Sequence, residues 1–127
     1  TFVSEPDYLV LTLPATDSTY HLVDRETLDA MRGDARLINV GRGSLVDEPA
    51  LVDGLRKGAI AGAVLDVFEE EPLPESSPLW ELSNCHVTPH VAADSFPEDI
   101  AGIFAENYRR YVAGRELLYR VDFERGY

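Results

Sequence analysis

The sequence predicts an α/β fold in which a parallel sheet is wound in the Rossmann-like, doubly wound manner. Short apolar runs bounded by proline, glycine or polar residues alternate along the chain with segments that carry apolar residues at helical spacing. The apolar runs lack the polar–apolar alternation of half-exposed strands, which is typical of parallel strands covered by helices on both faces. Right-handed crossovers are then expected to set the topology.

The apolar runs predict the strands of this sheet. They are expected at residues 8–13, 36–40, 60–68 and 85–89. The first run, "YLVLTL", is rich in residues that favour strands and lies between two prolines, which cannot donate to a sheet ladder. The second run, "RLINV", leads into a Gly-Arg-Gly loop, and the last, "CHVTP", ends at a proline.

Two short helices are predicted between these strands, over residues 24–33 and 47–58. Each begins at an aspartate that can cap the free N–H groups of the first turn and ends at a glycine that can take the left-handed conformation. The aspartates are Asp24 and Asp47, the glycines are Gly33 and Gly58, and Pro49 lies in the tolerated first turn of the second helix.

A longer helix is predicted from residue 95 to Gly114. The tetrapeptide "SFPE" fits a capping box, with Ser95 as the N-cap and Glu98 reaching back to it. An apolar stripe at helical spacing follows, which we expect to pack as core or across an interface between domains or subunits. Its members are Ile100, Ile103, Phe104, Tyr108, Tyr111 and Val112.

Composition excludes several classes of protein. The chain has 127 residues, of which 45% are hydrophobic, and this suits one modest globular domain. The formal net charge of −12 opposes binding to nucleic acid and to anionic membranes. No apolar stretch is long enough to span a membrane. Cys85 is the only cysteine, so no intrachain disulfide can form and a reducing, cytoplasmic location is expected.

The basic residues are unusual, because ten of the eleven are arginine and only Lys57 is lysine. A strongly acidic, lysine-poor surface is what we expect of a halophilic protein, such as a haloarchaeal one, since salt screens the self-repulsion. An acidic protein from a genome that favours arginine explains the same composition, and the sequence leaves both alternatives open.

Charged groups follow three successive predicted strands at their carboxyl ends. Arg42 follows the second strand, and His90 follows the fourth. Asp66 lies near the end of the third strand, and the glutamates at 69–71 come directly after it. Each has a structural explanation when taken alone: a surface turn, a solvated acidic loop or a capping histidine. Ligands of open α/β sheets bind beyond this edge, so together the groups favour an enzyme site.

Other reactive side chains are expected to be structural. His21 and His86 are too scattered to form a metal site with His90, and no metal is predicted. Cys85 is expected to be a small core residue, and Trp80 with its neighbour Leu79 to anchor a loop by packing.

The residues from "LINVGRGSLVDEPALVDGLRKGAIAGAVLDVFEEEPLP" through "SPLWELSNCHVTPHVA" resemble the signature region of the D-isomer-specific 2-hydroxyacid dehydrogenases. The resemblance covers almost the whole chain and is more specific than any single short motif. It implies a reaction in which a 2-oxo acid, such as hydroxypyruvate, glyoxylate or a phosphoglycerate-type acid, is reduced to a D-2-hydroxy acid by NADH or NADPH.

The resemblance also implies roles for individual residues. Arg42, in an N-x-x-R-G motif, would grip the substrate carboxylate, and His90, in a T-P-H motif, would be the general acid and base. Glu71, which precedes Pro72, would bond the other ring nitrogen of His90 and fix its tautomer, which leaves Glu69 and Glu70 as solvated loop. The residues expected to contact the cofactor are Asp66, Pro14, Thr19, Val40 and Gly41.

Part of the family's pattern is missing from this sequence. No G-x-G-x-x-G motif is present, although the family places one in the first half of its nucleotide-binding domain. Residues 1–92 are therefore expected to be the second half of that domain, and residues 93–127 a helix and tail that return to a substrate domain. The sequence does not begin with methionine, which suggests a fragment. Because the pyrophosphate site of the family is missing, this chain is expected to bind dinucleotide poorly and to be inactive alone.

Two alternatives remain open at this point. Corepressors that resemble this family keep the fold and sense dinucleotide without catalysis, so the chain could belong to an interaction module. It could also be an inactive fragment. The family resemblance implies a homodimer for the full-length protein, while the choice between NAD and NADP lies outside these residues.

Overall fold

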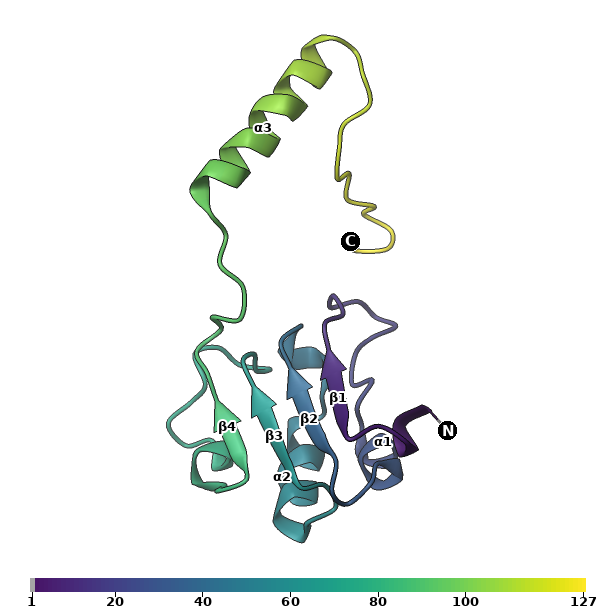
Figure 1. The fold of residues 1–127 in the computed structure, drawn as a ribbon, viewed down its shortest axis with the longest axis vertical. Coiled ribbons are helices and arrows are strands. Elements are labelled where there is room, and N and C mark those ends of the chain that lie inside the picture. Colours follow the sequence, from purple (N-terminus) through teal and green to yellow (C-terminus); the bar gives the residue numbers. More distant parts are fainter. Residues whose placement is uncertain (1) are drawn as a thin grey trace. The chain divides into compact units, whose positions relative to one another are not determined.

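The computed structural model describes residues 2–127 and divides the chain into two compact units, Thr1–Ala92 and Ala93–Tyr127 (Figure 1). The first unit contains a sheet and its crossovers. The second contains one long helix and an irregular tail. Among the described residues, no helix is both long and apolar enough to cross a membrane.

The first unit is built on four parallel strands in the order β1-β2-β3-β4. The strands are β1 (Tyr8–Leu11), β2 (Arg36–Asn39), β3 (Gly62–Leu65) and β4 (Cys85–Val87). The predicted α/β fold with a parallel, Rossmann-like sheet is thus confirmed. Each strand is shorter than its apolar run. The last residues of every run belong to the loops at the carboxyl edge, and β3 also begins two residues after the start of its run.

Only one face of this sheet is covered within the first unit. The helices α1 (Arg25–Ala30) and α2 (Glu48–Lys57) both lie behind the strands (Figure 1). On the opposite face Val10 is 51% exposed. The expectation of helices on both faces was therefore wrong for these residues. Right-handed crossovers that all step in the same direction across a sheet must lie on one face, and the strands formed by residues 2–127 follow one another in one direction only.

The caps of both short helices follow the predicted chemistry at their N-termini. The Asp24 carboxylate accepts a hydrogen bond from the Thr27 N–H at 2.9 Å, and the Asp47 carboxylate accepts one from the Ala50 N–H at 3.0 Å. Helix α2 ends at Gly58 as predicted, with a left-handed φ of 71°. Helix α1 ends before Gly33, because the chain turns extended at its C-cap, Met31.

The core lies between the sheet and these helices. Its largest fully buried side chains are aliphatic, and burying each one stabilises the fold by roughly 1.5–3 kcal/mol. They include Leu28, Leu37, Leu45, Leu51, Ile60, Leu65 and Leu79. Cys85 is partly buried against this core, and its burial raises the pKa of the thiol to about 11, so the thiol stays protonated near neutral pH.

The second unit contains helix α3 (Pro97–Val112). This helix does not begin at the residue that the capping box predicted. Its N-cap is Phe96, and no side chain caps it, so the assignment of Ser95 as N-cap was wrong. An N-cap at Ser95 would give Phe96 helical dihedrals directly before Pro97, a conformation that the proline ring disfavours. Proline instead takes its preferred first helical position.

The apolar stripe of α3 is exposed in the second unit. Phe104, for example, is 71% exposed, and no residue of this helix is buried. The helix closes with Gly114 in the left-handed conformation (φ 64°), as predicted. Asn107 then ties the tail to the helix, because its side chain bonds both the N–H and the C=O of Leu118.

Candidate active site

The candidate site is made by the loops that leave the carboxyl ends of the strands. In a parallel sheet these ends share one edge, so loops that are distant in the sequence meet there. The loops after β2, β3 and β4 supply Arg42, Asp66 with Glu71, and His90, respectively. The loop after β1 supplies Pro14 and Thr19.

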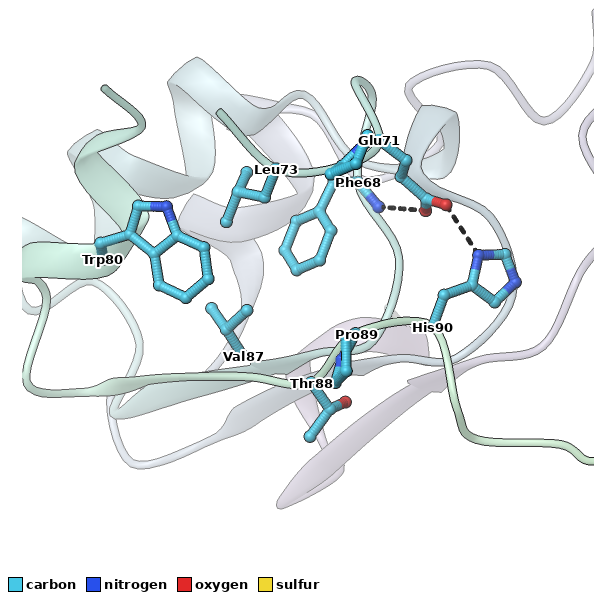
Figure 2. A pocket seen from close by; sticks show the side chains of 9 residues that line it. Phe68, Glu71, Leu73, Trp80, Val87, Thr88, Pro89 and His90 are labelled. Atoms are coloured by element: carbon cyan, nitrogen blue, oxygen red, sulfur yellow. Dashed lines mark hydrogen bonds and ion pairs between the residues drawn. The ribbon is translucent and has the colours of Figure 1, made fainter. Parts of the chain in front are cut away.

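The centre of the site is a pair formed by His90 and Glu71. The Nδ1 atom of His90 lies 2.7 Å from a carboxylate oxygen of Glu71, while the other carboxylate oxygen accepts the Phe68 N–H at 3.0 Å (Figure 2). The bond with His90, and to a smaller extent the bond with the Phe68 N–H, hold the pKa of the Glu71 carboxyl below its ordinary value. Because Nδ1 is engaged, Nε2 is the ring atom left for a proton transfer.

The backbone of His90 is held in an uncommon conformation. Its φ is 54°, in the left-handed region that histidine visits more readily than most side chains. The His90 N–H donates to the carbonyl oxygen of Asp66 at 2.9 Å, which ties the loop after β4 to the end of β3. This bond helps to keep the imidazole turned toward Glu71.

Asp66 supports the same loop with its side chain. It is only 3% exposed, and its carboxylate accepts hydrogen bonds from the Thr88 hydroxyl and from the N–H groups of Val91 and Ala92. Burial opposes ionisation, but these bonds outweigh it and hold the pKa of the Asp66 carboxyl below its ordinary value. A carboxylate has about four acceptor positions, so about one remains for a ligand.

Arg42 lies in the loop after β2. The backbone of this loop is held by the side chain of Asn39, a role that was not predicted from the sequence. Asn39 is only 1% exposed; its side chain accepts the Gly41 N–H at 3.1 Å and donates to the Arg42 carbonyl at 2.9 Å. The signal was present, because a buried polar residue closing an apolar strand needs local partners. The Arg42 guanidinium is exposed, bonds the Gly41 carbonyl at 2.7 Å, and its charge contributes to the lowered pKa of Glu71.

The two glycines beside Arg42 are required by contacts within the protein. A Cβ atom on Gly43 would lie 1.9 Å from the carbonyl group of Phe68, and one on Gly41 would lie 2.8 Å from the carbonyl oxygen of Leu13. These neighbouring loops pack too closely for any side chain at either position. The expected contact of Gly41 with a cofactor stays a prediction.

A cleft of about 660 Å³ opens beside the His90–Glu71 pair (Figure 2). Apart from that pair and Thr88 its lining is apolar, from Phe68, Pro72, Leu73, Trp80, Val87 and Pro89. The predicted anchoring role of Leu79 and Trp80 fits this wall: Leu79 is buried, and Trp80 donates its Nε1–H to the Pro74 carbonyl at 2.9 Å.

The residues predicted to face the cofactor occupy the same edge. The Thr19 hydroxyl donates to the Pro14 carbonyl at 2.8 Å and accepts the Thr16 N–H, which fixes the loop after β1. Val40 continues β2 and is partly exposed, with its N–H bonded to the Leu11 carbonyl at 3.1 Å.

The acidic run 69–71 divides in a way that was only partly expected. Glu69 is not simply solvated loop, because its carboxylate lies 2.7 Å from Nε2 of His21. Glu70 is exposed, and no hydrogen bond or ion pair of its side chain is found among residues 2–127. The same part of the chain contains no cluster of three metal-binding side chains.

The chain is similar to known proteins along its whole length. The family model for the NAD binding domain of D-isomer specific 2-hydroxyacid dehydrogenases matches residues 1–92. Glyoxylate/hydroxypyruvate reductase B from Pectobacterium carotovorum is 52% identical over 93 residues, 73% of this chain and 29% of that protein. An uncharacterized protein from Corynebacterium melassecola is 46% identical over 98% of this chain and 41% of its own length.

Solved structures give the same result. A D-isomer specific 2-hydroxyacid dehydrogenase from Xanthobacter autotrophicus in complex with NADPH and MES superposes with a TM-score of 0.95 at 47% identity, covering 99% of this chain and 52% of that one. An NADPH-dependent glyoxylate/hydroxypyruvate reductase from Sinorhizobium meliloti in complex with NADP and sulfate gives 0.94 at 34% identity, covering 99% and 42%. The chain thus spans between 29% and 52% of the length of these relatives. All four are bacterial, which gives no support to a haloarchaeal origin.

Proposed function

The chain belongs to the D-isomer specific 2-hydroxyacid dehydrogenase family through its NAD-binding domain, and we propose that it carries the acid–base machinery of an NAD(P)-dependent 2-oxo acid reductase. The observation that carries this proposal is the His90–Glu71 pair, 2.7 Å apart at the carboxyl edge of a parallel sheet and beside an open cleft. A histidine oriented by a carboxylate at such an edge is suited to move a proton.

Each residue has a defined task in this proposal. The bound dinucleotide would supply the hydride. Arg42 offers the planar, two-pronged guanidinium that pairs with a carboxylate and would orient the 2-oxo acid. His90 would give a proton from Nε2 to the oxygen of the reduced carbonyl group and take it back in the reverse direction. Glu71 would hold Nδ1 of His90 and so fix which ring nitrogen faces the substrate.

The relatives narrow the substrate and the cofactor. Because the Pectobacterium and Sinorhizobium proteins are named glyoxylate/hydroxypyruvate reductases, we propose glyoxylate and hydroxypyruvate as substrates, reduced to glycolate and D-glycerate. Bound NADPH and NADP in two of the similar structures make NADPH the expected reductant. The loop residues Pro14, Thr19, Val40 and Gly41, with Asp66, would lie along the cofactor.

The remaining expectations concern the whole protein. We propose that residues 93–127 contact a substrate domain or a second subunit, because the apolar side chains of α3 are exposed in this chain. A cytoplasmic homodimer is the expected state of the full-length protein.

The direct test follows oxidation of NADPH and NADH by the full-length protein with glyoxylate, hydroxypyruvate, pyruvate and phenylpyruvate. We expect turnover that is fastest with glyoxylate or hydroxypyruvate and with NADPH. Dinucleotide binding without turnover of any of the four acids would favour a sensing module, and failure to bind dinucleotide would contradict the proposal.

Replacing Glu71 by glutamine should shift the pH dependence of reduction. Glutamine can still accept the Phe68 N–H, but it lacks the negative charge that lies 2.7 Å from Nδ1 of His90. The bond from His90 lowers the pKa of the Glu71 carboxyl, so this charge is present throughout the neutral range. Without it, reductase activity should be lost at a lower pH than in the wild-type protein, measured as kcat against pH. Glu70→Gln, on the same exposed loop, is the control, and equal shifts in both variants would remove the special role of Glu71.

A further inference from the structure

A second histidine–glutamate pair lies at the same edge of the sheet. Nε2 of His21 is 2.7 Å from a carboxylate oxygen of Glu69, and the two side chains are 28% and 35% exposed. The His21 ring also stacks on Tyr20, with the ring centres 3.9 Å apart and the planes 14° from parallel. Nothing in the proposed proton transfer uses this pair.

The His21–Glu69 pair is one of several contacts that connect the loops after β1, β2 and β3. The loop after β1 is joined to the segment after β2, because the His21 N–H donates to the Ser44 carbonyl at 2.8 Å and the Val23 N–H donates to the Leu45 carbonyl at 2.9 Å. That segment also packs against the loop after β3, because Gly43 in the segment contacts the backbone of Phe68 in the loop. The His21–Glu69 bond then links the first and third loops directly.

The acidic run is therefore held at both ends by histidines from different loops. Glu69 bonds His21, and Glu71, two residues later, bonds His90. The Glu69 backbone is fixed as well, since its N–H donates to the Glu48 carboxylate at 2.6 Å. His21 itself has a φ of 48°, a conformation that costs free energy for a side-chain-bearing residue and persists only where surrounding contacts impose it.

We infer that His21 and Glu69 are positioning residues, whose bond holds the loop after β1, with Pro14 and Thr19, against the loop that carries Glu71. The inference rests on the proposed function, because it assumes that this loop lies along the dinucleotide. It assigns the pair to cofactor binding and leaves the proton transfer to Glu71 and His90. The two glutamates of one short loop thus have separate tasks.

A double-mutant cycle on the full-length protein tests this assignment. Glu69→Ala and His21→Asn are the single changes; asparagine tolerates the left-handed backbone of His21 but is too short to keep the bond. We expect each to raise the Kd for NADPH about tenfold, and the double variant to be no more than about twofold weaker than either, because both break one interaction. Glu69→Gln, which still accepts a hydrogen bond from a neutral imidazole, should restore most of the affinity.

Two further readouts and one control variant decide the outcome. The pH profile of kcat should stay where it is in all these variants, and thermal unfolding should confirm that they are folded. The exposed neighbour Glu70→Ala serves as the control. Affinities equal to that control, or additive losses, would overturn the inference while wild-type binding and turnover still supported the proposed function. A wild-type protein that binds no NADPH would instead overturn the proposed function itself.

Discussion

Replacing His90 by alanine is expected to lower kcat for 2-oxo acid reduction by about a thousandfold, within the range of general acid–base catalysis. Histidine is the side chain whose ordinary pKa lies nearest to neutral pH, and Nδ1 of His90 is already bonded to Glu71 at 2.7 Å. Without the ring, the proton must come from water, which is neither oriented nor matched in acidity. The Kd for NADPH should change by less than threefold, since His90 carries none of the predicted cofactor contacts.

Backbone strain is the main confounding effect in this experiment. His90 has a φ of 54°, and alanine disfavours that conformation, so His90→Ala changes both the ring and the loop. His90→Asn is the matched variant, because asparagine accepts the left-handed backbone but cannot serve as an acid near neutral pH. Both variants should be comparably inactive. Wild-type turnover in His90→Asn would show that the proposed mechanism is wrong.

Local chemistry made parts of the fold predictable from sequence. An aspartate three or four residues before an apolar helical face, as at Asp24 and Asp47, satisfies free N–H groups within one turn, and both caps were correct. The start of α3 was predicted wrongly because two local rules competed there. The Ser-x-x-Glu pattern pointed to Ser95, but the steric effect of Pro97 on the preceding residue prevailed.

Features that depend on contacts between distant segments were harder to predict. The His21–Glu69 pair joins residues 48 positions apart, and no local pattern marks either of them. Gly43 could be identified as a glycine in a loop. Glycine is required there because the Phe68 backbone lies against its Cα, and this contact exists only once the strands are aligned. The Glu71–His90 partnership was found through family resemblance, because nothing in the acidic run itself distinguishes Glu71 from Glu70.

Replacing Arg42 by alanine should raise the KM for the 2-oxo acid by about a hundredfold and lower kcat about tenfold. A charge-assisted, two-pronged bond to a carboxylate is lost, and with it the orientation of the carbonyl group toward His90. The expected loss of about four kcal/mol in kcat/KM corresponds to the product of these two factors. Steady-state kinetics with glyoxylate at saturating NADPH measure both, and Arg56→Ala, an exposed arginine in the last turn of α2, is the control.

Arg42→Lys separates geometry from charge. Lysine keeps the positive charge but offers a single ammonium group in place of a planar fork, so it should recover only part of the KM and little of kcat. The Asn39 side chain holds the Arg42 carbonyl and the Gly41 N–H, so the loop backbone is fixed independently of the side chain at position 42. Full recovery by lysine would mean that charge alone attracts the substrate, and an unchanged KM in the alanine variant would remove Arg42 from the substrate site.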